Sequence, residues 1–351
     1  MRVKDNIAID IRKVSEPDLK EFIQSKGQPG YRAKQIIEWI RHKGATDFDQ
    51  MTNLPKDLRE ILKAEFTFLP IQIDHVQKSK DGTIKTRFVL HDGYYIEAVL
   101  IPSVADKRYT ICVSSQVGCS LTCSFCATGQ MKMQRGLDAA EIVDQYRLVN
   151  DQCRTHFNAE LTNVVFMGMG EPLLNYNNVM EAIHWLTDQR GIAMPPRRIT
   201  ISTAGIAKLI LRLADEPIRV NLALSLHAAD DEKRNSIMPI NETNNLEVLM
   251  RALRYFYEKN KRRISYEYIA FDQFNTSSKD ALNLVKLCHP FPVLVNIIEY
   301  NPVEGVSFTK AGSEAIDRFA RILLKHRVNV TVRKSRGKDI DAACGQLANK
   351  G

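Results

Sequence analysis

Three cysteines in a Cys-x3-Cys-x2-Cys spacing, Cys119, Cys123 and Cys126, are the residues of this chain best placed to do chemistry. One tight loop can present all three thiolates together. A cube of four irons held by only three cysteines leaves one iron open to an external ligand, whereas electron-transfer clusters usually take four cysteines. The spacing therefore predicts a [4Fe-4S] cluster with an open iron, which Phe125 could shield from water.

Zinc is the alternative metal for these thiolates. A zinc site needs a fourth ligand, which His156 or His227 could supply, and it is typically built from two knuckles of paired ligands. The sequence has no second Cys or His pair of that kind. The cluster is therefore the preferred interpretation, and zinc stays open as the alternative.

The elements that must position the cluster loop follow from the hydrophobic pattern. From Tyr109 onward, short β-rich runs alternate with amphipathic helical runs, as in βα units on a parallel sheet. Six such units and a closing strand predict an α/β fold with a partial (β/α)6 barrel over residues 105–346, whose chemistry lies at the carboxyl ends of the strands. The expected strands are 109–114, 161–167, 198–202, 218–226, 264–270, 293–300 and 328–333.

Two smaller segments precede the barrel. Residues 1–70 show helical periodicity and predict a small N-terminal helical domain. Residues 71–104 alternate in the β pattern around Asp81-Gly82 and Asp92-Gly93, which predicts a connecting β-hairpin or meander. Residues 347–351 are expected to form a short tail.

Polar residues follow nearly every expected barrel strand. Singly, such residues most often cap helices or close turns, but their shared position at one end of a barrel favours a binding site. The stretches are Gly168-Met169-Gly170-Glu171-Pro172, Ser202-Thr203-Ala204-Gly205, Ser225-Leu226-His227 and Asn301-Pro302.

Bulk composition narrows the class of protein. The 351 residues include 49 Lys and Arg against 41 Asp and Glu, a net charge of +8 that fits a polyanionic partner such as nucleic acid. Seven cysteines, four of them between Cys112 and Cys126, suit reduced or metal-binding thiols better than a disulfide scaffold. No apolar run approaches a membrane span, and residues 1–14 lack a secretory apolar segment, so we expect a cytoplasmic protein without a membrane partner.

The cluster loop, with an aromatic residue before its last cysteine, resembles the signature of the radical S-adenosylmethionine (SAM) superfamily. The resemblance implies that S-adenosyl-L-methionine chelates the open iron and that one electron then cleaves it to a 5′-deoxyadenosyl radical. It also implies that the strand-end elements bind this cofactor through Gly170, Glu171, Ser202, Ser225, Leu226, His227 and Asn301.

Within that superfamily the chain is similar to the bacterial RNA (adenine-C2-)methyltransferases that act on 23S rRNA and tRNA. The similarity runs from Gly30-Tyr31-Arg32-Ala33-Lys34-Gln35 through the residues around Cys112 to Asp339–Leu347. It implies that Cys344 takes a methyl group from one SAM and that a second SAM yields the radical that activates this methyl. Glu97 would then accept a proton, and Cys112 would release the RNA through a disulfide with Cys344.

The same resemblance implies an electron donor such as flavodoxin and a monomeric enzyme. After Cys126-Ala127-Thr128-Gly129 the chain departs from the family pattern over residues 130–136, which leaves the packing of this loop and the substrate preference open. Two alternatives remain: a relative that methylates adenine at carbon 8, and a non-catalytic metal-binding RNA-binding protein.

Basic residues are denser in two patches, and the second of them is a candidate for contacts with RNA phosphates. The patch near Cys344 flanks the expected nucleophile and could hold phosphates around a flipped adenine. The patches are Lys259, Lys261, Arg262 and Arg263, and Arg333, Lys334, Arg336 and Lys338.

Overall fold

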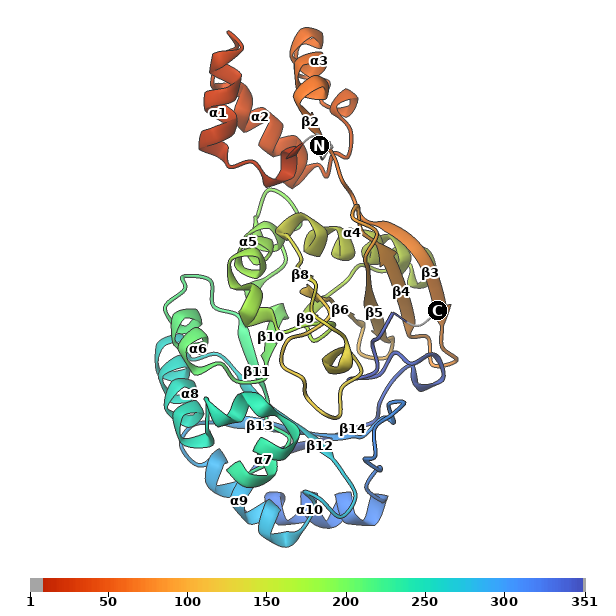
Figure 1. Cartoon of the computed structure of the whole chain (residues 1–351), viewed down its shortest axis with the longest axis vertical. Helices are drawn as coiled ribbons and strands as arrows, with labels where there is room; N and C mark the ends of the chain where they lie inside the picture. Colours follow the sequence, from red (N-terminus) through yellow and green to blue (C-terminus); the bar gives the residue numbers. More distant parts are fainter. Residues whose placement is uncertain (1–8, 350–351) are drawn as a thin grey trace, which may run out of the picture.

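A single mixed sheet organises the chain in the computed structural model, which describes residues 9–349. Residues 1–8 of the predicted helical domain and 350–351 of the predicted tail lie outside this range. Within it, ten strands run in the order β14-β13-β12-β11-β10-β9-β6-β5-β4-β3. The order follows the sequence from one edge to the other, so successive strands are spatial neighbours (Figure 1).

The barrel part of the sheet is parallel and confirms the predicted α/β fold with a partial barrel. Its strands are β6 (Arg108–Cys112), β9 (Asn163–Phe166), β10 (Ile199–Thr203), β11 (Asn221–Ser225), β12 (Ile264–Ala270), β13 (Val293–Glu299) and β14 (Asn329–Arg333). β11 is shorter than expected at both ends; beyond its carboxyl end, the positive φ of His227, 56°, turns the chain away.

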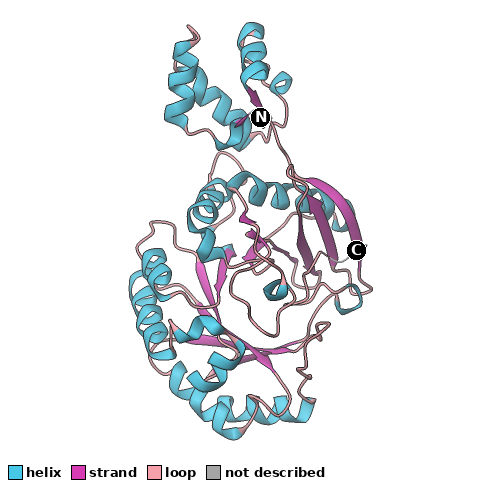
Figure 2. Cartoon of the chain, in the orientation of Figure 1, coloured by secondary structure: helices cyan, strands magenta, loops and turns pink. Residues whose placement is uncertain are grey.

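Helices connect the parallel strands and pack on the outer side of the sheet (Figure 2). The long α4 starts at the predicted capping box, in which Asp138 and Glu141 each bond the other's backbone N–H. None of the helices in residues 9–349 is both long and apolar enough to cross a membrane. The helices that connect the parallel strands are α4 (Ala139–Phe157), α5 (Tyr176–Thr187), α6 (Ala207–Ala214), α7 (Asp231–Ile237), α8 (Leu246–Asn260), α9 (Ser278–Cys288) and α10 (Ser313–Lys325).

The meander continues the barrel sheet. Strands β3 (Gln72–Lys78), β4 (Ile84–Val89) and β5 (Tyr95–Ser103) pair antiparallel, and β5 pairs antiparallel with β6. Strand β5 is mostly buried, whereas the edge strand β3 is exposed. The meander thus connects the N-terminal segment with the barrel and also forms part of its wall.

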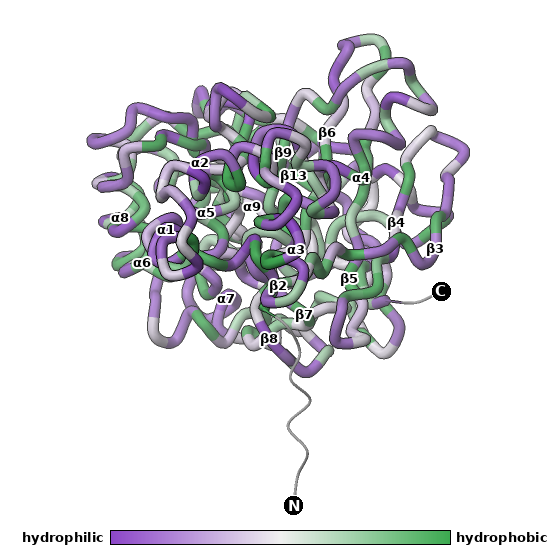
Figure 3. The backbone as a smooth tube through the Cα atoms, turned by 90° about the horizontal axis from the view of Figure 1, so that it is seen from above, coloured by the Kyte–Doolittle hydropathy of each residue, from purple (hydrophilic) through white to green (hydrophobic). Residues whose placement is uncertain are grey.

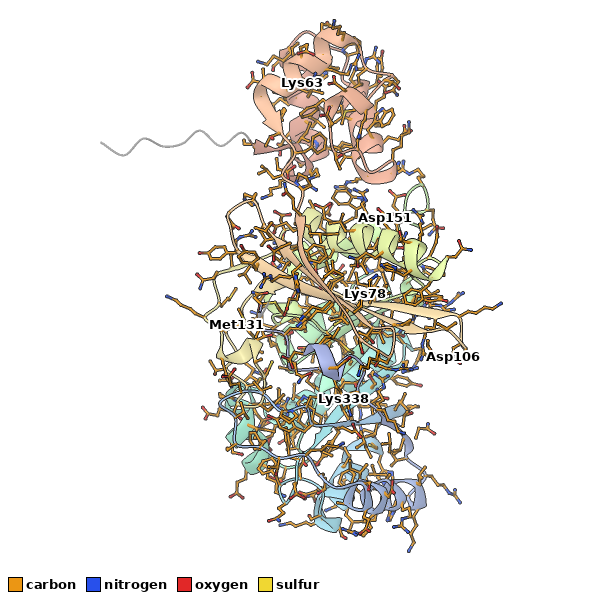
Figure 4. The ribbon with its side chains drawn as sticks, turned by 90° about the vertical axis from the view of Figure 1, so that its right-hand side faces the viewer. Lys63, Lys78, Asp106, Met131, Asp151 and Lys338 are labelled. Atoms are coloured by element: carbon orange, nitrogen blue, oxygen red, sulfur yellow. The ribbon has the colours of Figure 1, made fainter. Side chains whose placement is uncertain are left out.

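The chain between β14 and Asn349 runs back across the open side of the barrel to the meander (Figure 1). Asp339 accepts hydrogen bonds from the Ser79 hydroxyl at 2.6 Å and the Lys80 backbone at 3.2 Å, and the Gly337 N–H donates to Asp81 at 2.9 Å. Figure 4 shows the segment that carries Lys338 near the meander, whose strand β3 ends at Lys78. This C-terminal segment, residues 334–349, therefore joins the two edges of the sheet.

The N-terminal segment contains α1 (Glu16–Ser25), α2 (Tyr31–Ile37), the π-helical turn Glu38–His42 and α3 (Lys56–Glu65). Strands β1 (Ile9–Asp10) and β2 (Phe66–Thr67) pair in parallel and bracket these helices. The tube in Figure 3 shows hydrophobic positions interleaved with hydrophilic ones along the helices, as expected for elements that bury one face.

A buried ion-pair network fixes this segment to the barrel. The Arg12 guanidinium lies 2.7 Å from Asp10 and 2.7 Å from Asp144 of α4, and the three side chains are at most 8% exposed. Burial opposes the charge on Arg12, but its hydrogen bonds and ion pairs with the two carboxylates raise its pKa above the usual value. The Trp185 indole of α5 also donates to the Arg41 carbonyl at 2.9 Å, so two barrel helices hold the N-terminal segment.

The Arg12 network gives a stability prediction. Arg12→Met keeps most of the side-chain volume but leaves two buried carboxylates without their cation, so we expect the free energy of unfolding to fall by about 3–5 kcal/mol. Urea denaturation followed by circular dichroism measures the change. Arg154→Met is the control, because Arg154 of α4 is 56% exposed and its ion pairs contribute at most about 1 kcal/mol; Figure 4 labels Asp151, one of its two partners. Equal losses in the two variants would contradict a stabilising role of the network.

Candidate active site

The three cysteines of the cluster loop lie directly beyond the carboxyl end of β6. Before them, β7 (Gln116–Val117) pairs with β8 (Arg135–Gly136), which closes the loop at its base. Gly118 has φ 78°, and a Cβ there would lie 2.4 Å from the Lys132 carbonyl oxygen, so only glycine fits where the two sides of the loop meet.

The thiols of the loop are close enough to influence one another's ionisation. Burial raises the pKa of Cys119 to about 11, and burial together with the neighbouring thiolates raises the pKa of Cys123. Backbone N–H groups of Thr128 and Gly129 point at the Cys126 sulfur and oppose the effect of burial there. Three partly buried thiols on one loop fit an iron–sulfur cluster, which binds cysteines as thiolates.

Among residues 9–349, no three Cys, His, Asp or Glu side chains converge in the manner of a single-metal site. In a four-iron cluster each cysteine binds a different iron. The three sulfur atoms therefore need to lie on one loop around the cluster and do not need to converge on one point. His156, one of the two alternative zinc ligands, lies on α4 with its Nδ1 3.5 Å from Lys78 Nζ of the meander.

Phe125 is buried beside the cluster loop, where the sequence predicts a shield against water. Its ring meets the His227 ring edge-on at 4.8 Å and lies 5.6 Å from the Phe271 ring. Ile237 and Met238 belong to the same buried apolar cluster. Phe125 therefore joins the loop to the strand ends opposite.

Gly170 and Glu171 are fixed beside the cluster loop by Gln116. Gly170 has φ 92°, and a Cβ there would lie 2.4 Å from Gln116 Cβ. The Gln116 side-chain oxygen accepts from the Glu171 N–H at 2.8 Å, and the Glu171 carboxylate accepts from the Leu173 and Ala204 N–H groups at 3.0 and 2.7 Å. Burial outweighs these hydrogen bonds and raises the pKa of Glu171 to about 7, so a bound ammonium group would favour its charged form.

His227 is a neutral hydrogen-bond donor at the end of β11. Its Nδ1 accepts from the Ile269 N–H at 3.2 Å, which places the ring proton on Nε2. Burial, with the nearby Arg234 cation, lowers the pKa of His227 to about 3. The ring therefore stays uncharged at physiological pH.

The other strand-end residues lie at the same end of the barrel. The Ser202 and Ser225 hydroxyl oxygens are 3.4 Å apart on adjacent strands, and Leu226 is fully buried. The Asn301 side-chain amide donates to the Ser335 hydroxyl at 2.9 Å, so this residue also holds the start of the C-terminal segment. The predicted cofactor residues thus line one end of the barrel, which faces the cluster loop.

The C-terminal segment brings Cys344 to the cluster loop. The Ala127 N–H donates to the Gly345 carbonyl at 2.8 Å, and the Thr128 hydroxyl donates to the Leu347 carbonyl at 2.6 Å. Cys344 is exposed to solvent, but partial desolvation and the Glu267 carboxylate raise the pKa of its thiol.

Cys112, the last residue of β6, is buried near Cys344. Burial, followed by the negative charge of an ionised Cys344, raises the pKa of the Cys112 thiol. All seven cysteines are free thiols, so a Cys112–Cys344 disulfide is absent from this state. The structure places the two residues within electrostatic reach of each other, although they are far apart in sequence.

Glu97 lies on β5 and is fully buried. Its Oε2 accepts from the Ala348 and Asn349 N–H groups at 3.0 and 3.1 Å, while its Oε1 lies 3.4 Å from Lys85 Nζ and makes no hydrogen bond. Lys85 also donates to the Asp341 carbonyl at 3.4 Å. Sequence reasoning missed Lys85, because β4 also contains Thr86 and Arg87 and its local pattern does not distinguish a buried lysine from a solvent-facing one.

The divergent loop 130–136 is firmly attached beside the site. Arg135 forms two 2.8 Å hydrogen bonds with Glu141 and a 2.5 Å ion pair with Asp92 of the meander turn. The Gln134 N–H donates to the Val117 carbonyl at 2.9 Å. The change from the family pattern therefore leaves the base of the cluster loop closed.

Known proteins are similar to this chain over most of its length. Residues 9–67, the span bracketed by β1 and β2, match the family described as the ribosomal RNA large subunit methyltransferase N-terminal domain, and residues 113–285 match the radical SAM superfamily. A probable dual-specificity RNA methyltransferase RlmN from Cytophaga hutchinsonii is 49% identical over 340 residues, 97% of this chain and 93% of the relative. The dual-specificity RNA methyltransferase RlmN of Geobacter sulfurreducens is 43% identical over 342 residues, 97% of this chain and 92% of the relative.

A solved structure is similar over nearly the whole chain. The radical SAM methyltransferase from Sphaerobacter thermophilus superposes with a TM-score of 0.89 at 40% identity, covering 97% of this chain and all of that one (100%). The resemblance therefore includes the N-terminal segment and the meander as well as the barrel.

The Thr128 contact gives a prediction for the C-terminal segment. Thr128→Val keeps the shape of the side chain but leaves the Leu347 carbonyl without its donor, which costs about 1–3 kcal/mol when the acceptor is buried. We expect the Ala348 and Asn349 amides to exchange with deuterium roughly tenfold faster or more. Peptide-level hydrogen exchange by mass spectrometry measures this.

Thr155→Val is the matched control, since the Thr155 hydroxyl bonds only the Asp151 carbonyl within α4, at 2.8 Å. Unchanged exchange at residues 342–349 in Thr128→Val would show that this hydroxyl does not hold the segment.

Proposed function

The chain belongs to the RlmN family of dual-specificity radical SAM RNA methyltransferases, and from this we propose that it methylates carbon 2 of one adenosine in 23S rRNA and in tRNA. The observation that supports the proposal most is the convergence of four elements that are distant in sequence. The cluster loop, Cys112, Glu97 and the Cys344 segment meet at one end of the barrel. A non-catalytic protein that only bound RNA and a metal would not need Cys344 beside a second free cysteine.

We propose that Cys119, Cys123 and Cys126 hold a [4Fe-4S] cluster. When bound, the cluster and SAM supply the methyl group and the radical for the reaction. Glu171 faces the cluster loop with a carboxylate that two backbone N–H groups hold in place, which suits it to bind the methionyl ammonium. His227, with its Nε2 proton, and the paired Ser202 and Ser225 hydroxyls supply neutral polar contacts for the rest of the cofactor.

Cys344 would accept the methyl group of one SAM, with loss of its thiol proton. After losing one hydrogen atom to the radical derived from a second SAM, this methyl carbon would bond to adenine carbon 2. The need for this route is chemical, because carbon 2 of adenine is electron-poor and does not attack a sulfonium methyl group directly. The solvent-accessible Cys344 is suited to meet both the cofactor and an extruded base.

Two buried residues would complete the turnover. Glu97 would accept the proton from carbon 2 as the adduct returns one electron to the cluster, and its Oε1, which makes no hydrogen bond and lies 3.4 Å from Lys85 Nζ, is the acceptor. Cys112, after loss of its thiol proton, would then attack the Cys344 sulfur, so that a sulfur–sulfur bond forms as the sulfur–carbon bond breaks and the released carbon takes up a proton to become the methyl group. The resulting disulfide must be reduced before the next cycle.

We assign RNA contacts to the N-terminal helical segment and to the basic patch around Arg333–Lys338. The division into an accessory domain to residue 70, a meander over 71–104 and a catalytic barrel over 105–346 is part of this proposal. So are a cytoplasmic location, a monomeric enzyme and a flavodoxin-like electron donor.

The decisive experiment is anaerobic incubation of the reconstituted enzyme with SAM, a reductant and a 23S rRNA fragment or tRNA. Mass spectrometry of the digested nucleosides should reveal 2-methyladenosine. A product of 8-methyladenosine would instead assign the chain to the carbon-8 chemistry. Failure to cleave SAM would leave the non-catalytic RNA-binding interpretation.

The two-cysteine mechanism predicts opposite outcomes for two variants. Cys344→Ala should retain iron and SAM cleavage but lose protein methylation and RNA product, because no thiol remains to take the methyl group. Cys112→Ala should accumulate a covalent RNA–protein adduct, visible as a slow band on a denaturing gel. Cys288→Ala is the control, because Cys288 is at the end of α9 and should behave like the unmodified enzyme. A Cys112→Ala enzyme that turns over without an adduct would contradict the release step.

The basic patch near Cys344 gives a further prediction. Lys334 and Arg336 are exposed and, in the part of the chain described, form no ion pair, so their charges are available to phosphates. Replacing both with Glu should weaken RNA binding by about tenfold or more and make the salt dependence shallower by about one unit of slope per lost contact. Lys259→Glu with Lys261→Glu is the control of equal charge change, placed where α8 leads into the opposite ends of the strands. Equal loss in the two double variants would indicate only a general charge effect.

A further inference from the structure

Arg234 of α7 is a fully buried cation that the proposed mechanism does not use. It is 0% exposed, and its guanidinium donates four hydrogen bonds to neutral oxygens. Nε donates to the Leu226 carbonyl at 3.1 Å, and one terminal nitrogen donates to the Ser225 and Ala204 carbonyls. The other terminal nitrogen donates to the Asn241 side chain at 2.6 Å.

These acceptors are the ends of the strands that line the cofactor site. Ala204 follows β10, Ser225 is the last residue of β11, and Leu226 lies between Ser225 and His227. One guanidinium therefore ties together two strand ends from inside the protein. The planar fork of arginine suits this task, because its five N–H groups are fixed relative to one another.

The helix that carries Arg234 also contacts the cluster loop. The Ser124 N–H donates to the carbonyl of Ile237, the last residue of α7, at 3.1 Å, and the Ser124 hydroxyl is 3.4 Å from the same oxygen. Ser124 follows Cys123 directly. Arg234 and Cys123 are close enough that each affects the other's ionisation.

The charge of Arg234 has no directly bonded carboxylate. Asp231 is linked to it only through Asn241, whose amide nitrogen donates to Asp231 Oδ1 at 2.8 Å. A buried charge without an anionic partner costs several kcal/mol. Cys123 is near enough for a charge on its sulfur to act on Arg234, so binding of a thiolate-held cluster would supply the missing negative charge.

We propose that Arg234 is a positioning residue that favours the reduced state of the cluster and fixes the strand ends of the SAM site. Reduction adds one electron, and hence one negative charge, to the cluster, so a buried cation beside Cys123 stabilises the reduced form more than the oxidised form. Arg234 therefore raises the reduction potential and makes electron uptake easier. The inference rests on the proposed assignment of Cys119, Cys123 and Cys126 as cluster ligands.

The test is a redox titration of the reconstituted full-length protein, with the reduced cluster followed by electron paramagnetic resonance. Arg234→Gln removes the charge and should shift the midpoint potential to lower values. Arg234→Lys keeps the charge but cannot make the four hydrogen bonds of the guanidinium. Its midpoint potential should therefore stay close to that of the unmodified protein, while its affinity for SAM falls. A Gln variant with the potential of the unmodified protein would overturn the proposal.

Asp231→Asn separates an electrostatic role from a structural one. Removing this carboxylate leaves the Arg234 charge less compensated, so the potential should shift upward, opposite to Arg234→Gln. A structural disturbance would move both variants in the same direction, and that result would also overturn the proposal. Because Asp231→Asn and Arg234→Lys keep the buried cation, they test it even if Arg234→Gln does not fold.

The unmodified protein separates this inference from the function on which it rests. If it assembles no cluster on the three cysteines, the proposed cofactor site is wrong. If it assembles one and cleaves SAM but the variants show no opposite shifts, only the role of Arg234 is wrong.

Discussion

The arrangement of the active site depends on the docking of the C-terminal segment between the cluster loop and the meander. Its backbone bonds Ala127 and Thr128 on one side and the Glu97 carboxylate on the other. These contacts set the position of Cys344, which no strand or helix carries. A reaction that moves a carbon between a cofactor, a thiol and a base requires such a fixed position, since a displacement of about 1 Å can cost a hundredfold in rate.

The continuity of the sheet makes this docking possible. The meander pairs with β6 and so extends the barrel wall beyond its first strand, while β14 ends the sheet on the other side. The C-terminal segment lies between these two edges and reaches the meander through Gly337 and Asp339. The same wall carries α4, to which Arg12 fastens the N-terminal segment. The proposed RNA-contacting segment and the proposed nucleophile are therefore held by one framework.

The sequence predicted the parts of this framework that follow from local patterns. The alternation of strands and helices gave the α/β barrel, and the Asp138–Glu141 spacing gave the capping box of α4. The bracketing of the helical segment by β1 and β2 was not predicted, because two-residue strands carry no periodicity. Nor were the partners of Lys85, Thr128 and Arg234, whose contacts join residues far apart in the chain. A polar residue in a buried stretch signals that a partner exists, but only the tertiary structure identifies it.

Three buried side-chain atoms around the proposed active site make no hydrogen bond within the described part of the protein. In residues 9–349, Glu97 Oε1, Gln116 Nε2 and Asn296 Oδ1 are buried without a hydrogen bond. Gln116 lies beside Glu171. The Asn296 amide nitrogen donates to Glu267, whose negative charge raises the pKa of Cys344. Each such atom costs about 1–3 kcal/mol in the absence of a partner. A bound cofactor or base that supplied a donor or acceptor to one of these atoms would offset this cost.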